Sequence, residues 1–273
     1  MTEFAFSLKA QRNDEHIVSG TAIVIAPYLA ITAGHVLDGF FRHFYGKSIG
    51  DSSAPQLPSE QFSLQAMQMR PDLGLASIWN VTKFWFCKFT DISVLRLTPR
   101  TTEHLEYNWR TPTLCLAPPS LGDRIASFGY MKSHANAENQ KITWYVEGVT
   151  SVGTVKEVYP LGRDKVMLPF PCFRTNMRIE GGMSGGPAFD DNGQLIGINC
   201  SGFSAQDAGG EHTGHISCLW PLMGLKVDME TSIHSQGTFY PLLDLASRGI
   251  IHTSNLDCIS LAHDGMLYYH EKK

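Results

Sequence analysis

The chain of 273 residues contains no run of about 18 consecutive apolar residues, so a membrane-spanning helix is not expected. It also lacks a strong charge of either sign, since 22 Lys and Arg against 26 Asp and Glu give a formal net charge of −4. A near-neutral chain has no broad cationic surface for phosphate groups. Neither a nucleic acid nor a membrane is therefore expected as a partner.

Signals for disulfides and for secretion are also missing. The six cysteines lie at positions 87, 115, 172, 200, 218 and 258, and no two of them form a Cys-x-x-Cys pair. The first ten residues lack the basic start and the long apolar region of a secretory signal. We therefore expect a cytoplasmic protein whose cysteines are free, buried thiols.

What the chain does contain is a serine enclosed by glycines, in the stretch Ile179-Glu-Gly-Gly-Met-Ser-Gly-Gly-Pro187. Glycine adopts backbone conformations that other residues avoid, so such a loop can point its amides at a reacting group. An oxyanion hole beside a nucleophile requires this arrangement. The alternative is a glycine-rich turn in which Ser184 has no chemical role.

The same stretch fits the Gly-x-Ser-x-Gly nucleophile elbow of α/β-hydrolases, which needs a strand, a sharp turn and then a helix. After Ser184, however, come Pro187 and the turn sequence Asp-Asn-Gly at 191–193. These residues predict a short strand, a hairpin turn and a second strand over 194–199. The elbow interpretation is therefore disfavoured.

Two further motifs precede the serine. The first is Thr32-Ala-Gly-His35, at the end of an apolar stretch, and the second is Asp91-Ile-Ser-Val-Leu95. With Gly182-Met-Ser-Gly-Gly-Pro187 they have the order His, Asp, Ser. In this order the sequence resembles the chymotrypsin-like serine peptidases, and most closely the bacterial branch that includes the HtrA (Deg) proteases. The resemblance covers roughly residues 14–226.

The strand pattern and the resemblance agree on the fold class. Many short strands with turns every 8–12 residues predict an all-β protein. The resemblance implies two six-stranded barrels of the chymotrypsin type, with the active site in the cleft between them. We expect one barrel, with the His and Asp, in residues 1–112, and the other, with the Ser, in residues 113–227. Residues 228–273 are too short for the PDZ domain of many HtrA proteases and are expected to pack on the peptidase body as an extension.

Local patterns predict several further elements. They are strands over 16–26 and 29–32, a helical segment after Gly34, an aromatic run at 81–89 that packs in the core or covers it as a loop, a helix within 240–248, and a hairpin of 258–261 with 266–269. The stretch 222–227 is too short for periodicity to separate helix from strand.

The resemblance implies a catalytic triad. His35 would act as the general base, Asp91 would hold the histidine ring, and Ser184 would be the nucleophile. The backbone amides of Gly182 and Ser184 would form the oxyanion hole. The alternative aspartate is Asp72, which begins the similar sequence Asp-Leu-Gly-Leu-Ala.

The choice between the two aspartates depends on the residues downstream of them. In the family, the aspartate strand leads through a connector to the sequence Gly-Asp-x-(Val/Ile). Here Gly122-Asp-Arg-Ile125 follows Asp91 at the expected distance along the sequence. This spacing favours Asp91.

The substrate pocket is less clearly encoded. In the family, the residue six before the serine lies at the base of the primary pocket, and here it is Arg178. Arg178 would either pair with an acidic substrate side chain or turn away to solvent or to Glu180. Asn199, Cys200 and Ser201 are expected to form the opposite wall.

One histidine pair has a spacing found in metal sites, His212-x-x-His215. No cysteine or carboxylate motif accompanies it. We therefore expect a solvated loop and a pocket wall there, and neither a metal nor a cofactor.

Together these features predict a serine endopeptidase, a hydrolase that cleaves peptide bonds through an acyl-enzyme intermediate. Two other functions remain open. One is a catalytically idle trypsin-like fold that binds proteins, and the other is an acyl or ester hydrolase. The expected partners are a protein or peptide substrate and a regulatory protein that restrains a cytoplasmic protease.

Overall fold

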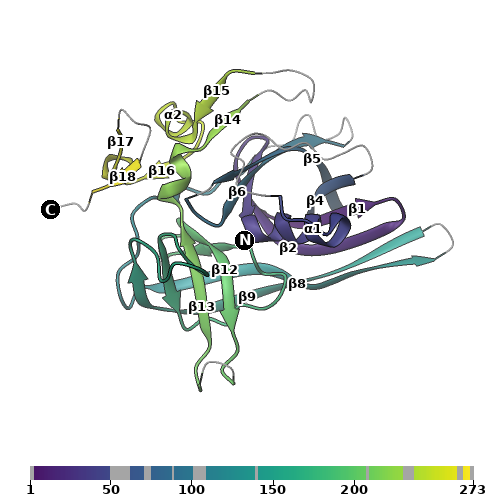
Figure 1. Cartoon of the computed structure of the whole chain (residues 1–273), viewed down its shortest axis with the longest axis horizontal. Coiled ribbons are helices and arrows are strands. Elements are labelled where there is room, and N and C mark those ends of the chain that lie inside the picture. The colour runs from purple at the N-terminus through teal and green to yellow at the C-terminus, as the bar shows by residue number, and fades with distance from the viewer. Residues whose placement is uncertain are drawn as a thin grey trace.

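The computed structural model describes residues 3–49, 62–70, 75–87, 89–100, 109–138, 141–206, 209–229, 237–262 and 267–270. In this part the chain forms two β-barrels and a C-terminal group of short elements (Figure 1). The double barrel confirms the all-β fold of the chymotrypsin type that the sequence predicts.

The first barrel is a closed antiparallel sheet in the order β1-β2-β3-β6-β5-β4. Its strands are β1 (Ala5–Arg12), β2 (Glu15–Ala26), β3 (Leu29–Ala33), β4 (Phe62–Arg70), β5 (Leu75–Cys87) and β6 (Ile92–Pro99). Apolar side chains fill its interior, and every residue of β3 is buried. Phe84 and Trp85, in the aromatic run of the sequence, lie on β5 and are fully buried, which confirms that this run packs in the core.

The second barrel closes in the order β11-β8-β9-β10-β13-β12, because β11 pairs with both β8 and β12. Its strands are β8 (Arg124–Glu138), β9 (Lys141–Tyr159), β10 (Cys172–Thr175), β11 (Pro187–Phe189), β12 (Leu195–Phe203) and β13 (Thr213–Cys218). The short strand β7 (Leu114–Cys115) runs parallel to β12 on its outside. The strand, turn and strand expected after the serine are β11 and β12, paired antiparallel.

The β8–β9 hairpin links the two barrels. Figure 1 shows it leaving the second barrel and running alongside the first. Strand β8 contacts β2, so the first barrel lies against the base of this hairpin. The contact brings the glycine-rich loop of the second barrel close to the start of the apolar part of β2.

The C-terminal elements are small. They are η3 (Trp220–Gly224, a 3₁₀ helix), β14 (Lys226–Asp228), β15 (Phe239–Pro241), α2 (Leu242–Ser247), β16 (Thr253–Ser254), η4 (Leu256–Cys258), β17 (Ile259–Leu261) and β18 (Leu267–Tyr269). The antiparallel pair β17–β18 confirms the expected hairpin, and α2 confirms the expected helix. The undecided stretch at 222–227 contains the end of η3 and the start of β14.

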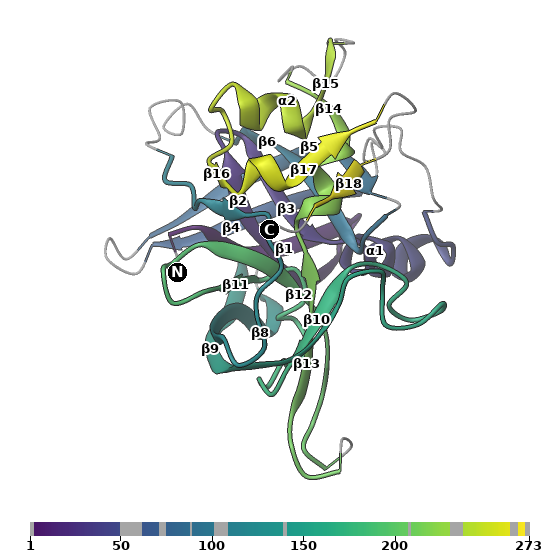
Figure 2. The ribbon, with the colours of Figure 1, turned by 90° about the vertical axis from the view of Figure 1, so that its left-hand side faces the viewer.

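These elements pack against the first barrel. Leu242, Leu245 and Ile251 belong to the same buried cluster as the apolar side chains of that barrel. Lys83 of β5 and Asp228 of β14 form a salt bridge with N–O distances of 3.0 and 3.1 Å. Figure 2 shows α2 and β14–β18 gathered on one side of the molecule. The domain boundaries at residues 112 and 227 stay predictions.

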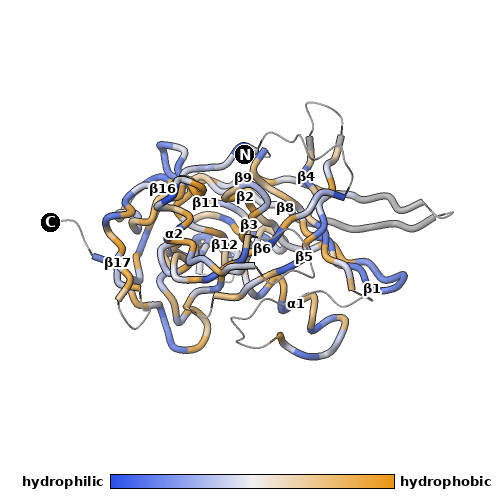
Figure 3. Tube along the Cα trace, turned by 90° about the horizontal axis from the view of Figure 1, so that it is seen from above, coloured by the Kyte–Doolittle hydropathy of each residue, from blue (hydrophilic) through white to orange (hydrophobic). Residues whose placement is uncertain are grey.

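Hydropathy agrees with this architecture. In Figure 3 orange, hydrophobic stretches occur in the strands of the barrels, in α1 and in the C-terminal elements, and the turn beyond β1 is blue. All six cysteines are free, and five of them are buried.

Among the described residues, no helix combines the length and the hydropathy that a membrane span requires.

Candidate active site

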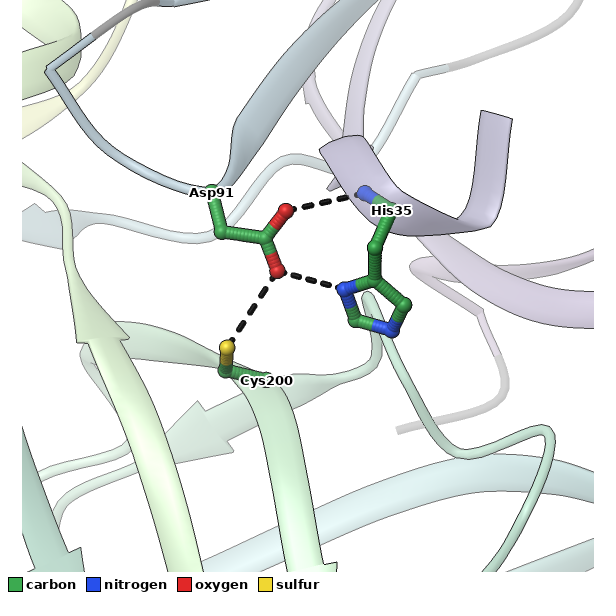
Figure 4. A group of neighbouring side chains, drawn as sticks. All are labelled: His35, Asp91 and Cys200. Carbon is green, nitrogen blue, oxygen red and sulfur yellow. Dashed lines mark hydrogen bonds and ion pairs between the residues drawn. The ribbon is translucent and has the colours of Figure 1, made fainter. Parts of the chain in front are cut away.

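His35 is the second residue of α1 (Gly34–Tyr45), the helix that begins where β3 ends. Its backbone N–H donates to Asp91 Oδ1 at 2.8 Å, and its ring Nδ1 lies 2.5 Å from Asp91 Oδ2. Asp91 immediately precedes β6, which pairs with β3. The register of this pair therefore places the carboxylate beside the histidine (Figure 4). The alternative aspartate, Asp72, lies outside the described residues.

Cys200 is a second partner of the Asp91 carboxylate. Its thiol donates to Oδ2 at 3.2 Å, and it comes from β12 of the other barrel (Figure 4). The sequence predicts Cys200 only as part of a pocket wall. The contact with Asp91 depends on how the two barrels meet, and no local motif reports that.

The carboxylate controls the protonation of both neighbours. Burial lowers the pKa of His35, but the hydrogen bond and the charge of Asp91, together with the charge of Asp38, raise that pKa above its ordinary value. Burial raises the pKa of the Cys200 thiol, and the charge of Asp91 and the hydrogen bond to it raise that pKa further. At neutral pH Cys200 is therefore a thiol that donates to Asp91, and a proton on the His35 ring is stabilised.

The glycine-rich loop before β11 consists of two consecutive turns. Met183 N–H donates to Glu180 O at 3.0 Å, and Gly186 N–H donates to Met183 O at 2.9 Å. Gly182 has φ +95°, and a Cβ atom there would lie 2.6 Å from Tyr130 O. Gly185 has φ +81°, and a Cβ atom there would lie 2.7 Å from Ala33 N. Glycine is therefore required on both sides of Ser184 by conformation and by space.

Thr21, on β2 of the first barrel, binds this loop at two points. Its N–H donates to Ser184 O at 2.8 Å, and its Oγ1 donates to Gly182 O at 3.0 Å. The same oxygen accepts the N–H of Tyr130 at 2.9 Å. Thr32 Oγ1 in turn donates to Thr21 O at 2.7 Å. The loop is thus positioned by the first barrel through a residue that no sequence motif indicates.

Two cavities adjoin His35. The smaller, of about 290 Å³, is lined by His35, Gly182 and Ser184 together with residues such as Phe40 and Ser19. The larger, of about 670 Å³, is lined by His35, Asp91, Cys200 and Ser201 and by the segment 166–170. In the described part of the chain, no hydrogen bond joins Ser184 Oγ to His35 Nε2. The two side chains nevertheless share one cavity between the barrels.

Residues 20–198 of the chain match the family model of the trypsin-like peptidase domain. The chain belongs to this family. The match covers all three sequence motifs and parts of both barrels. No curated protein sequence matches the chain.

Solved structures share the fold of this trypsin-like peptidase at low sequence identity. The Rv3671c protease from M. tuberculosis in its active form has 16% identity and a TM-score of 0.54, and the match covers 87% of this chain and 84% of that one. The MamO protease domain from Magnetospirillum magneticum has 13% identity and a TM-score of 0.50, over 80% of this chain and 93% of that one. These likenesses show the common double-barrel fold.

Asn199 supports the serine loop of the trypsin-like peptidase from beneath and does not line either cavity. Its side chain is fully buried and donates to Met183 O at 3.0 Å, while its Oδ1 accepts from Ser127 at 2.8 Å. Its backbone bonds with Gly185 and Gly186. The polar groups of Asn199 are thus already used by the loop and by Ser127, and its assignment to a pocket wall stays a prediction.

Neither Arg178 nor Ile179 lies where it would line a deep primary pocket. Arg178 forms an ion pair with Glu180, its side chain is 63% exposed, and it lines neither cavity. Ile179 is only 9% exposed. A Cβ atom on Gly202 would lie 2.8 Å from Ile179 Cβ, and one on Gly214 would lie 2.7 Å from Ile179 Cδ1. Ile179 therefore fills the space between the serine loop and strands β12 and β13.

Ser201 lines the larger cavity, and His215 lies behind it. Ser201 Oγ is 3.5 Å from His215 Nδ1. Arg163 donates to His215 Nε2 at 3.1 Å. Burial, together with the smaller effect of the charges of Arg163 and Arg174, lowers the pKa of His215 to about 4, so the ring is neutral at pH 7. His215 therefore orients Arg163 at the cavity wall.

Proposed function

We propose that this trypsin-like peptidase is a serine endopeptidase that works through His35, Asp91 and Ser184. One observation carries the proposal: the His35 ring, paired with Asp91, lines the same cavity as Ser184 and Gly182. A serine hydroxyl is a weak nucleophile at neutral pH and needs a base at its side. Membership of the trypsin-like peptidase family supports a peptide substrate.

In this proposal, His35 Nε2 removes the proton of Ser184 Oγ as the hydroxyl attacks the peptide carbonyl. Asp91 keeps the ring proton on Nδ1 and stabilises the imidazolium that forms. The same proton then passes to the leaving amine, which leaves an acyl group on Ser184. A water molecule, activated by His35, hydrolyses this ester and regenerates the serine.

The oxyanion of each tetrahedral intermediate would be bound by the N–H groups of Gly182 and Ser184. In the described part of the chain neither N–H has a hydrogen-bond partner, so both are available. The carbonyl of Met183, which shares a peptide unit with the Ser184 N–H, accepts hydrogen bonds from Asn199 and Gly186. Thr21 binds the carbonyls of Gly182 and Ser184. These bonds support a loop whose N–H groups are positioned before a substrate arrives.

The same geometry supports a small side chain on the residue before the scissile bond. Ile179 fills the space beside the serine loop, and Arg178 is paired with Glu180 outside the cavities. Ile179, like Arg178, lines neither cavity, but a large side chain that entered between the serine loop and strands β12 and β13 would have to displace it. We therefore favour small residues such as Ala at this position over the acidic residues that Arg178 first suggested.

A second candidate function is a catalytically idle fold that binds peptides. The missing hydrogen bond between Ser184 Oγ and His35 Nε2 in the described part of the chain favours it. Catalytic hydrogen bonds often tighten only when a substrate binds. The absence of this bond therefore does not by itself decide between an idle fold and an active peptidase. The cytoplasmic location and the regulatory partner also stay predictions.

The test is to incubate the purified chain and its Ser184→Ala variant with a diverse peptide library and to map new termini by mass spectrometry. An endopeptidase produces internal cuts that are absent with the variant. Peptide binding without cuts by the unmodified chain would support the idle fold. Turnover of simple esters alone would support an acyl hydrolase.

A further inference from the structure

The Asp91 carboxylate lies between an imidazole and a thiol. His35 Nδ1 is 2.5 Å from Asp91 Oδ2, and Cys200 Sγ is 3.2 Å from the same oxygen. All three potential ligand atoms lie within 4.8 Å of one another. Among the described residues, this is the one group of three or more His, Cys, Asp or Glu side chains that is so compact. Figure 4 shows the three side chains converging from different elements.

We propose that His35, Asp91 and Cys200 form a binding site for a thiophilic divalent cation, such as Zn²⁺, and that the bound ion inhibits the peptidase. Zinc sites with three protein ligands draw on nitrogen, oxygen and sulfur donors of this kind and keep a fourth position for water. With metal–ligand distances of about 2.0–2.3 Å, the donors of a tetrahedral site lie about 3.3–3.7 Å apart. The observed Sγ–Oδ2 distance of 3.2 Å is already close to this value. The distance between His35 Nδ1 and Asp91 Oδ2, now 2.5 Å, would have to increase by roughly 1 Å.

The site is accessible from solvent. His35, Asp91 and Cys200 all line the cavity of about 670 Å³, and the His35 side chain is 46% exposed. Two arginines line the same cavity, but each is already paired with a carboxylate. Arg42 binds Asp38 at 2.6 Å, and Arg163 binds Asp164 at 2.9 Å. A cation entering the cavity therefore meets the Asp91 carboxylate while the positive charge of each arginine is neutralised by its own partner.

Binding exchanges protons for the metal. The Cys200 thiol releases its proton to solvent and binds as a thiolate, so one Zn²⁺ replaces one H⁺. The proton on His35 Nδ1 moves to Nε2, because Nδ1 must offer its lone pair to the metal. A ring protonated at Nε2 cannot accept the proton of Ser184. The proposed inhibition by the metal thus rests on the proposed peptidase function, whereas the binding of the metal ion does not.

The hydrogen bond alone does not account for a cysteine at position 200. A serine hydroxyl could also donate to Asp91, but hydroxyl oxygen is a poor ligand for Zn²⁺ compared with thiolate. Cys200→Ser is therefore a close structural match that lacks the soft donor. Cys115→Ser is the matched control, because Cys115 is a free, partly exposed thiol on β7 that lines neither cavity.

Binding is tested with Co²⁺ as a spectroscopic probe on the Ser184→Ala protein, which removes any dependence on activity. We expect one equivalent to bind with a thiolate-to-cobalt charge-transfer band, and Zn²⁺ to displace it. The band should disappear in Cys200→Ser and in a second variant, Cys200→Ala, and should persist in Cys115→Ser. A band that survives both Cys200 substitutions, or the absence of stoichiometric binding in the Ser184→Ala protein, would overturn the proposal.

Inhibition is tested on the active chain by titrating peptide cleavage with Zn²⁺ and reversing it with a chelator. The zinc concentration for half inhibition should rise by about tenfold or more in Cys200→Ser, each variant being compared with its own metal-free rate. An unchanged concentration would contradict inhibition through this site. If the metal-free chain shows no cleavage, the proposed function fails, and the cobalt experiment still decides whether the site exists.

Discussion

The backbone N–H of Thr21, in the first barrel, donates to the carbonyl of Ser184, in the second, at 2.8 Å. The hydroxyl of Thr21 also donates to Gly182 O at 3.0 Å. The loop that would supply the nucleophile and the oxyanion hole is therefore held by the barrel that supplies His35. This arrangement makes Thr21 a positioning residue for the serine loop.

Replacing Thr21 with Val keeps the shape of the side chain but leaves Gly182 O and Tyr130 N without their partner. An unpaired buried group lowers the free energy of unfolding by about 1–3 kcal/mol. Because the loop that carries Ser184 also loses its support, we expect kcat to fall by roughly ten- to a hundredfold with little change in KM. Thr21→Ser restores the hydroxyl and should recover most of kcat. Steady-state kinetics and urea unfolding on all three proteins provide the measurement. Equal kcat for the Val and Ser variants would contradict this role.

The pKa of His35 predicts the pH dependence of cleavage. Only the neutral ring can act as a base, and Asp91 raises the pKa of that ring. The value of kcat/KM should therefore rise with pH and level off above a midpoint higher than the ordinary value of about 6.5. Asp91→Asn should move this midpoint down and lower the rate by roughly 10⁴.

Asp72→Asn is the control for that experiment, because Asp72 is the other aspartate that fits the family pattern. It should leave both the rate and the pH midpoint nearly unchanged. A larger loss in Asp72→Asn than in Asp91→Asn would show that Asp72, and not Asp91, is the aspartate of the triad.

Ile179 should determine the size of the side chain accepted before the scissile bond. The unmodified chain should prefer small residues, and Ile179→Ala should extend cleavage to larger apolar residues such as Leu and Phe. Arg178→Ala should leave the profile unchanged, since Arg178 pairs with Glu180 outside the cavities. Library profiling of the three proteins measures this. A preference for Glu or Asp that disappears in Arg178→Ala would restore the acidic interpretation.

The buried salt bridge between Lys83 and Asp228 should anchor the C-terminal elements. The two side chains are only 4% and 3% exposed. Lys83→Met leaves a carboxylate buried without its partner, and we expect the free energy of unfolding to fall by about 3–5 kcal/mol. In the double variant Lys83→Met, Asp228→Leu both charges are gone, and most of this loss should be recovered. Urea denaturation measures the free energy of unfolding of each variant. If the double variant loses at least as much stability as Lys83→Met alone, the unpaired buried charge is not the cause of the loss.

Local motifs indicate some members of the candidate site. The motifs around His35 and Ser184 single out these two residues, because a strand end and a glycine-rich turn have local signatures, and both residues line one cavity. The same holds for the hairpin of β11 and β12, whose turn contains Asp191-Asn-Gly193. Alternation and turn residues also indicated the all-β class.

Contacts across the two barrels could not be predicted in this way. The Cys200–Asp91 and Thr21–Ser184 hydrogen bonds join residues that are 109 and 163 positions apart (200 − 91 and 184 − 21). The sequence pattern groups Asn199 with Cys200 and Ser201, but β12 has a register shift between Asn199 and Ser201 that no local pattern indicates. That irregularity leaves Asn199 beneath the serine loop, where its amide is buried.

The most direct test of the central claim is the reaction of the chain with a fluorophosphonate, measured by intact mass and peptide mapping. A competent triad should add one phosphonyl group per chain, on Ser184. His35→Ala should slow the labelling by several orders of magnitude, because it removes the base. No adduct under conditions that label a control serine hydrolase, or an adduct on another residue, would contradict the proposal that Ser184 is the nucleophile.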